Sequence, residues 1–179
     1  NPRPTRAEVS DVANAIFDGT SAVMLSGETA AGKYPLESLQ MMVDIARQTE
    51  CSIDYWKDLE NARPTMLSSV ANAISHATCT TAMDLSAKAI ITVTHAGRTA
   101  RLVSRFRPAC PIVASTVFPR IQRQLNLCWG VCPILVNEVQ TTDEMFDVGM
   151  SSAKLCGFLF DGDIVVLTGG TPVGMSGTT

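Results

Sequence analysis

The residues best suited to chemistry in this sequence lie between Thr94 and Thr99, a segment that reads Thr-His-Ala-Gly-Arg-Thr. Threonine hydroxyls and an arginine guanidinium donate hydrogen bonds, and a glycine lets the backbone bring its N–H groups close to a ligand. Donors gathered without a carboxylate favour a negatively charged ligand such as a phosphate group. The segment therefore predicts an anion site. The alternative is an ordinary strand-to-helix turn with a surface arginine.

The elements on either side of this turn explain how its donors would be presented. Ala89–Val93 is an almost wholly apolar run, rich in β-branched residues, that predicts a strand buried on both faces. After the turn, apolar residues recur at the spacing of one helix face, namely Ala100, Leu102, Val103 and Phe106. Strand, short glycine-containing turn and helix form an arrangement in which free backbone N–H groups point at an anion.

The alternation of strand and helix continues along the chain. Further strands are predicted over Pro111–Val117, Gly130–Asn137 and Asp163–Thr168. Helices are predicted over Leu67–Ser86 and Pro119–Leu127, and a third begins at the capping box of Thr141 and Glu144. Short connections between alternating strands and helices predict an α/β fold, a three-layer domain with a mostly parallel sheet flanked by helices.

The first fifty residues form a separate pattern of helix, strand and helix. A capping box of Thr5 and Glu8 predicts the start of one helix, and Pro35 suits the first turn of the next. Between them, the apolar run Ser21–Ser26 predicts a short buried strand. The glycine-containing loop that follows resembles a phosphate loop. We reject nucleotide binding there, because Tyr34 replaces the magnesium-binding hydroxyl and Pro35 delays the helix start.

Composition restricts the class of protein. The 179 residues carry a net charge of −3 and are 46% hydrophobic, which gives material for a packed core and argues against disorder or a nucleic-acid partner. No apolar run approaches the roughly 20 residues that span a bilayer, and the N-terminal residues do not resemble a signal peptide. Most of the six cysteines lie in apolar segments, which predicts reduced, core-filling thiols, and Cys128 and Cys132 lack further metal ligands.

Residues 1–38, NPRPTRAEVSDVANAIFDGTSAVMLSGETAAGKYPLES, together resemble the pyruvate kinase family from the end of its seventh barrel strand into its last barrel helix. The rest of the chain resembles the C-terminal domain of that family. The resemblance implies two parts, with residues 1–50 as the tail of the TIM-barrel catalytic domain and residues 51–179 as the allosteric and oligomerisation domain. Trp56 is expected to anchor the junction against a neighbouring helix.

The resemblance also implies an activity for the whole enzyme, the transfer of a phosphoryl group from phosphoenolpyruvate to ADP in glycolysis, with Mg²⁺ and K⁺. The catalytic and metal-binding residues of the family would lie upstream of Asn1, so no catalytic residue and no metal ligand is assigned to this sequence. The fragment alone is expected to be inactive and to bind no cofactor. We expect it to be cytoplasmic, to form homo-oligomers as part of a tetrameric parent, and to have no nucleic-acid or membrane partner.

By the same resemblance, the turn corresponds to the pocket where many pyruvate kinases bind the phosphate of an activating sugar phosphate, and the glycine-rich C-terminal loop would fold over that ligand. The predicted effector site consists of Thr94, His95, Ala96, Gly97, Arg98, Thr99, Gly170, Gly174, Ser176 and Gly177. His95 and Ala96 stand where other members often carry lysine or serine, and Met145 lies near the position of an arginine for a second phosphate. A singly phosphorylated sugar or a nucleotide monophosphate therefore fits at least as well as fructose 1,6-bisphosphate.

Two hypotheses from other classes remain open. One is a free-standing oligomerisation or interaction module that binds no ligand, in which the unpaired edge of Ser21–Ser26 pairs with another chain. The other is a flavodoxin-like redox domain. It would need flavin absorbance and a phosphate-binding turn at the first strand, and no feature of the sequence points to it specifically. Saturable binding of a sugar phosphate, lost in Thr94→Ala and Thr99→Ala, would separate the effector site from the ligand-free module.

Overall fold

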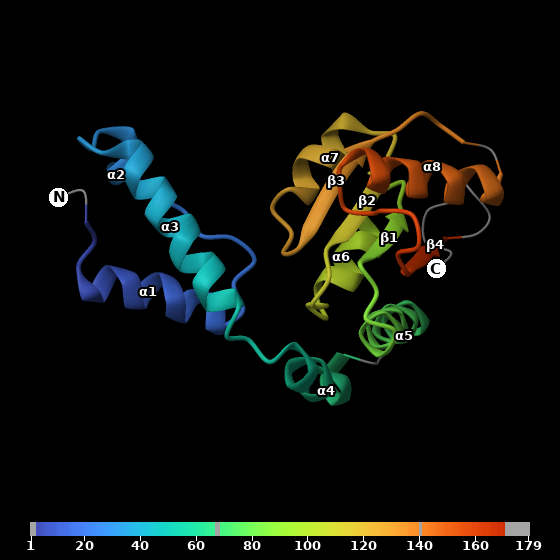
Figure 1. Cartoon of the computed structure of the whole chain (residues 1–179), viewed down its shortest axis with the longest axis horizontal. Helices are drawn as coiled ribbons and strands as arrows, with labels where there is room; N and C mark the ends of the chain where they lie inside the picture. Colours follow the sequence, from blue (N-terminus) through green and yellow to red (C-terminus); the bar gives the residue numbers. More distant parts are fainter. Residues whose placement is uncertain (1–2, 67–68, 140, 171–179) are drawn as a thin grey trace. The chain divides into compact units, whose positions relative to one another are not determined.

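The computed structural model describes residues 3–66, 69–139 and 141–170 of the chain. The chain divides into two compact units, Asn1–Asp54 and Tyr55–Thr179 (Figure 1). Each unit has its own packing and is described by itself. In the described part of the chain, no helix combines the length and the apolar character needed to cross a membrane.

The first unit holds α1 (Arg6–Phe17), α2 (Gly27–Ala30) and α3 (Pro35–Glu50). The capping box predicted at the start of α1 is confirmed, because Thr5 Oγ1 accepts from Glu8 N at 3.3 Å while Glu8 Oε2 accepts from Thr5 N at 2.7 Å. Pro35 occupies the first turn of α3, where its missing N–H leaves no helical hydrogen bond unmade. α1 and α3 pack against each other.

The short strand predicted over Ser21–Ser26 is not present. These residues connect α1 to α2 without regular secondary structure, and Met24 among them is 86% exposed. A strand is held by ladder hydrogen bonds to a neighbouring strand, and the described residues of this unit contain no strand that would supply them. This prediction was wrong for a tertiary reason, because the apolar character of a segment does not provide its partner.

The second unit is an α/β domain, as predicted. Its elements follow in the order α4 (Tyr55–Met66), α5 (Val70–Asp84), β1 (Ala89–Val93), α6 (Arg98–Ser104), β2 (Ile112–Thr116), α7 (Pro119–Leu125), β3 (Val131–Leu135), α8 (Thr142–Leu155) and β4 (Val165–Gly169). β1 has the predicted bounds, and the other predicted strands and helices each overlap an element. At the start of α8, Thr141 Oγ1 accepts from Glu144 N at 3.2 Å, which confirms the predicted beginning of that helix.

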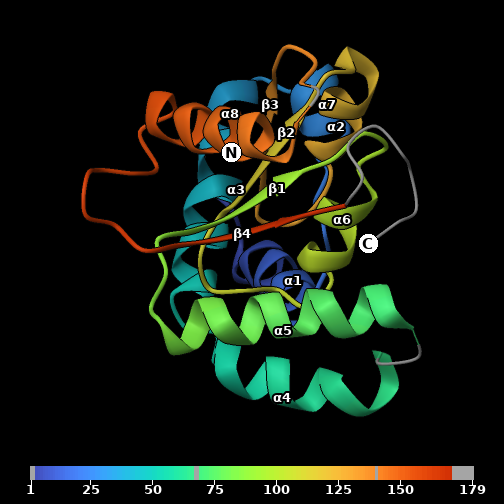
Figure 2. The ribbon, with the colours of Figure 1, turned by 90° about the vertical axis from the view of Figure 1, so that its right-hand side faces the viewer.

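The four strands form one sheet in the order β3-β2-β1-β4, and every neighbouring pair is parallel. From β1 to β3 the chain moves in one direction across the sheet, and it then returns past β1 to reach β4. Because crossovers between parallel strands are right-handed, these two directions require helices on opposite faces. Accordingly, α6 and α7 pack on one face together with α5, and α8 packs on the other, which gives the predicted three layers (Figure 2).

The alternation of side chains along β1 and β2 divides the core between the two faces. Ile90 and Ile112 are register partners, and both belong to the cluster formed with α5 and α6. Ile91 and Val113 are the next pair, and they pack with residues of α8 on the opposite face. All four side chains are fully buried. β1 is thus held from both sides, which fixes the position of the turn that follows it.

α4 is held to this domain by residues other than the predicted one. Trp56 is 42% exposed, whereas Leu59 of the same helix is buried in the cluster with α5 and α6. Tyr55 has its ring centroid 5.8 Å from that of Trp129. Tyr55 and Leu59 are four residues apart and therefore lie on the same side of the helix. Within this unit, Leu59 and Tyr55 make these contacts of α4, whereas Trp56 stays exposed, so the anchoring predicted for Trp56 is not found here.

Candidate anion site

The turn between β1 and α6 lies where the sheet changes its winding direction. The crossover that leaves β1 passes over one face, and the crossover that enters β4 passes over the other. The carboxyl ends of β1 and β4 are neighbours, since Val93 is the register partner of Gly169. Open α/β sheets bind ligands at such a reversal, outside the carboxyl ends of the strands. The topology thus favours a ligand at the turn that the sequence analysis singled out.

Gly97 fixes the shape of this turn. Its φ of +75° and ψ of 4° lie in the left-handed region, which residues other than glycine rarely adopt. A Cβ at this position would lie 3.0 Å from Cγ2 of Ile121 and 3.3 Å from Cδ2 of Leu125, both on α7. α7 therefore packs directly against the backbone of the turn, and glycine is the residue that permits this approach.

The side chains of the turn divide into buried hydroxyls and exposed groups. Thr94 and Thr99 are buried, and Thr94 N donates to a carbonyl of β2 at 2.9 Å, which ties the start of the turn to the sheet. Arg98 is exposed, and no carboxylate of the described residues forms an ion pair with it. His95 is also exposed, and its ring meets that of Phe118 edge-on with 4.5 Å between centroids. The turn thus carries two buried threonines and an exposed guanidinium that forms no ion pair among the described residues.

A third hydroxyl lies below the turn, at Thr92 of β1. Because side chains alternate along a strand, Thr92 faces the same side of the sheet as Thr94. Thr92 Oγ1 is fully buried and has no hydrogen-bond partner among the described residues, a property that Ser115 Oγ shares on the opposite face. An unpaired buried hydroxyl costs about 1–3 kcal/mol. Near the carboxyl end of β1, the hydroxyl of Thr92 can therefore form a hydrogen bond that no described protein group makes with it.

Arg101 belongs to this site, although the sequence analysis did not identify it. Its Nη1 donates to Ala96 O at 3.2 Å, and its Nη2 donates to Gln124 Oε1 at 3.0 Å. Arg101 lies in α6 and reaches back to the turn, so its positive charge stays beside residues 94–99. The sequence shows a basic residue within one helical turn of this segment, which could have indicated its involvement. The direction of the Arg101 side chain, however, depends on the packing of α7, which the sequence alone does not specify.

A methionine packs against the carboxyl end of β4. Met145 of α8 is 3% exposed, and a Cβ on Gly169 would lie 2.9 Å from its Cε atom. A thioether carries no charge and donates no hydrogen bond, so Met145 provides nothing to hold a phosphate. Gly170 directly follows β4 and is partly buried. The other residues predicted to cover the ligand lie outside the described residues, namely Gly174, Ser176 and Gly177.

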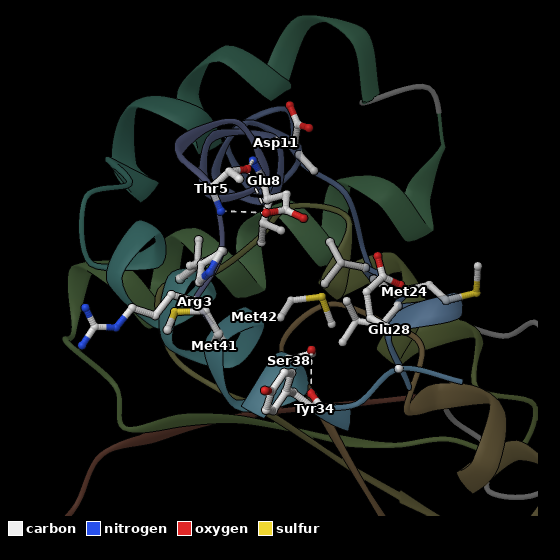
Figure 3. Close-up of a pocket in the computed structure, with 18 of the residues that line it drawn as sticks. Arg3, Thr5, Glu8, Asp11, Met24, Glu28, Tyr34, Ser38, Met41 and Met42 are labelled. Carbon is white, nitrogen blue, oxygen red and sulfur yellow. Dashed lines mark hydrogen bonds between the residues drawn. The ribbon is translucent and has the colours of Figure 1, made fainter. Parts of the chain in front are cut away.

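The first unit contains a separate hollow of about 670 Å³ (Figure 3). Apolar and charged side chains both line it, among them Met24, Met41, Met42, Glu8 and Glu28. Hydrogen bonds from the backbone N–H and hydroxyl of Thr5 hold the pKa of Glu8 below its usual range. Hydrogen bonds from backbone N–H groups, those of Glu28 itself and of Ser26, lower the pKa of Glu28. Both carboxylates thus act as caps at the starts of helices.

The segment that resembles a phosphate loop borders the same hollow. Glu28 Oε2 accepts from Ser26 N at 3.0 Å, so a carboxylate of the chain itself already occupies the start of α2. In a true phosphate loop, backbone N–H groups at this place bind the phosphates of a nucleotide. α2 also ends at Ala30, before Lys33 is reached. This geometry agrees with the rejection of nucleotide binding from the sequence.

The described part of the chain gathers no set of metal ligands, since no three or more histidine, cysteine, aspartate or glutamate side chains there form a group that could hold a metal ion. All six cysteines are free, in agreement with the prediction of reduced thiols. Cys79 is buried next to α6, and burial raises the pKa of its thiol to about 12. Cys51 and Cys156 lie at the surface and do not contribute to the core.

Comparison with known proteins identifies the family. A family model described as "Pyruvate kinase, alpha/beta domain" matches residues 72–179, which include the turn and the four strands. The chain belongs to the pyruvate kinase family. A second family model, described as "Pyruvate kinase, barrel domain", matches residues 1–39. The resemblance stated from the sequence is thereby confirmed for both ends of the chain.

Individual pyruvate kinases match this family member over all or nearly all of its length. Those of Clostridium acetobutylicum and Geobacillus stearothermophilus are each 47% identical to it over 179 residues. The crystal structure of Cryptosporidium parvum pyruvate kinase matches with a TM-score of 0.88 and 36% identity over 94% of this chain. The chain spans 38% and 30% of the two bacterial enzymes and 35% of the crystallised chain. It is therefore about one third as long as these relatives.

Proposed function

We propose that this chain is the C-terminal part of a pyruvate kinase. The whole protein then transfers the phosphoryl group of phosphoenolpyruvate to ADP with Mg²⁺ and K⁺, as a cytoplasmic homo-oligomer. The match to the barrel-domain model at residues 1–39 and to the α/β-domain model at residues 72–179 supports this order of domains. The described residues do not fit a metal site, so we assign no step of phosphoryl transfer to them and expect no pyruvate formation from the chain alone.

For the chain itself we propose a regulatory function, the binding of a phosphorylated effector at residues 94–99. The observation that carries this proposal is the left-handed turn at Gly97, which lies at the carboxyl edge of β1 and β4 beside the buried hydroxyls of Thr94 and Thr99. Hydroxyls and backbone N–H groups there donate to the phosphate oxygens, and Arg98 supplies positive charge. The unpaired hydroxyl of Thr92 supports a polar ligand at the same edge.

The effector that suits this site carries one phosphoryl group, as in a sugar monophosphate or a nucleotide monophosphate. The donors and both guanidinium groups lie on the side of α6, at residues 94–101. On the side of β4, buried Met145 lies against Gly169 and offers neither charge nor a hydrogen-bond donor. A second phosphate on that side would lose its water without gaining a partner, which is unfavourable.

Isothermal titration of the chain with glucose 6-phosphate tests the effector site, with unphosphorylated glucose as the ligand control. We expect saturable heat release for the phosphate ester alone, and a loss of binding in Thr94→Ala and Thr99→Ala. Thr81→Ala is the matched control, since Thr81 is an exposed residue of α5. Equal affinity of all variants for glucose 6-phosphate would show that the ligand binds elsewhere than at the turn. The absence of saturable heat with any phosphorylated compound would contradict the effector function.

A ligand-free oligomerisation module is the second candidate, and exposed apolar side chains favour it. Leu155 at the end of α8 is 89% exposed, and Phe160 in the following loop is 75% exposed. Large apolar groups at a surface favour association. Sedimentation of the chain, which reports its assembly, separates the candidates when it is combined with the glucose 6-phosphate titration, which reports binding. An effector domain binds the ester whatever its assembly state, whereas a pure association module assembles and shows no response to it.

A further inference from the structure

One guanidinium connects the turn at residues 94–99 to α7. Arg101 donates to Ala96 O at 3.2 Å and to Gln124 Oε1 at 3.0 Å. Both acceptors are neutral, so these hydrogen bonds leave the positive charge of Arg101 uncancelled. The guanidinium is a planar, rigid group, and its N–H directions are fixed relative to one another. It satisfies both acceptors at once only while the turn and α7 keep their present spacing.

The hydrogen bond to Ala96 O also sets the orientation of the next amide group. In a trans peptide the C=O and N–H groups point in opposite directions. Because the carbonyl of Ala96 faces Arg101, the N–H of Gly97 is turned away from Arg101. Rotation of this peptide would exchange the two groups and present a carbonyl oxygen in place of the N–H. A carbonyl oxygen is a hydrogen-bond acceptor and repels an anion.

α7 restrains the same peptide from a second direction. Gly97 lies so close to α7 that a Cβ on it would be 3.0 Å from Ile121 and 3.3 Å from Leu125. Leu125 is fully buried in a cluster with Ala100 of α6 and Ala114 of β2. This cluster fixes α7 on the sheet, so Gly97 cannot shift without disturbing packed side chains. The Ala96–Gly97 peptide is thus held by α7 through packing and by Arg101 through a hydrogen bond.

We infer that Arg101 is a positioning residue of the anion site, which holds the Ala96–Gly97 peptide so that the Gly97 N–H is available to a bound phosphate. This inference rests on the effector site proposed above. Arg101 acts through the backbone, and its part differs from that of Arg98, which is exposed and has no ion-pair partner among the described residues. Affinity for phosphate then depends on Gln124 of α7, which is outside the turn.

Titration of the full chain with inorganic phosphate, followed by calorimetry, tests this inference. Arg101→Lys keeps the charge but replaces the rigid fork by one ammonium group, which cannot reproduce both hydrogen bonds. Gln124→Ala keeps Arg101 and removes its second acceptor. Arg105→Lys is the matched control, since Arg105 is exposed at the C-cap of α6. We expect phosphate binding to weaken roughly tenfold in Arg101→Lys and roughly threefold in Gln124→Ala, the sizes that correspond to one lost or loosened hydrogen bond.

The amide resonance of Gly97 in the ¹H–¹⁵N NMR spectrum of the ligand-free chain provides a second readout. A general loss of stability would not shift this one resonance selectively. We expect this resonance to shift in Arg101→Lys and in Gln124→Ala while it stays in place in Arg105→Lys. Wild-type affinity in both test variants would overturn the positioning role and leave the effector site intact. Weaker binding with an unmoved Gly97 resonance would overturn it as well. Wild-type chain that does not bind phosphate saturably would overturn both proposals.

Discussion

Replacement of Gly97 by alanine tests how tightly α7 packs on the turn. Alanine at φ +75° carries the strain of the left-handed region, about 1–2 kcal/mol. Its Cβ also lies 3.0 Å from Ile121 and 3.3 Å from Leu125, and overpacking of this kind costs roughly 1–3 kcal/mol. The free energy of unfolding is therefore expected to fall by about 2–5 kcal/mol, a large part of the ~5–15 kcal/mol that is typical of a folded domain.

Gly157 supplies a matched control for the backbone contribution. Its φ of +74° is almost the same, but a Cβ at Gly157 would meet nothing within 4 Å. Gly157→Ala is therefore expected to cost only the backbone strain of about 1–2 kcal/mol. The difference between the two variants isolates the steric contact with α7.

Urea unfolding followed by tryptophan fluorescence measures these differences. Both tryptophans, Trp56 and Trp129, belong to the second unit, so the signal reports the unfolding of the domain that contains the turn. Gly97→Ala should lower the transition midpoint well below that of Gly157→Ala, with an unchanged slope. Equal midpoints for the two variants would refute the claim that α7 holds the turn by direct packing.

Three further predictions concern single groups. Thr92→Val removes an unpaired buried hydroxyl at nearly constant shape, so we expect the free energy of unfolding of the ligand-free chain, measured in urea, to rise by roughly 1 kcal/mol. A clear loss of stability would show that the Thr92 hydroxyl has a hydrogen-bond partner. Iodoacetamide at pH 8 should modify the exposed Cys156 in the folded chain. Cys79 is buried and its thiol has a raised pKa of about 12, so it should react only after unfolding. Rapid labelling of Cys79 in peptide mass spectra of the folded chain would contradict its burial. Because the pKa of Glu8 is lowered from 4.5, the α1 cap is complete above pH 4.5 and is lost as the pH falls through the folded-state pKa of Glu8. Circular dichroism should therefore show a loss of helix in acid that Glu8→Gln lacks. Identical acid curves for the two proteins would exclude this cap.

The sequence was sufficient for the features that depend on local pattern. β1 has the bounds given by the apolar run Ala89–Val93, and Thr5 and Glu8 form the reciprocal cap that their spacing requires. The parallel sheet followed from the alternation of strands and helices with short connections. The strand and the cap are determined by residues close together in sequence. The parallel sheet follows from a connection rule that does not depend on individual side chains.

Features that depend on distant partners were missed. The run Ser21–Ser26 is apolar enough for a strand, but it lacks a neighbour among the described residues with which to form a ladder. Arg101 joins the candidate site only because Gln124, 23 positions further along the chain, lies where the guanidinium fork can reach it. No local pattern encodes either relation, because both arise from which elements pack together.

A crystal structure of the chain grown with glucose 6-phosphate is the most direct test of the proposed effector site. We expect a phosphate group within hydrogen-bonding distance of the hydroxyls of Thr94 and Thr99, with the Gly97 N–H directed at it and Met145 left without contact to any phosphate. A turn closed by its own side chains, with the sugar phosphate bound elsewhere or absent, would contradict it.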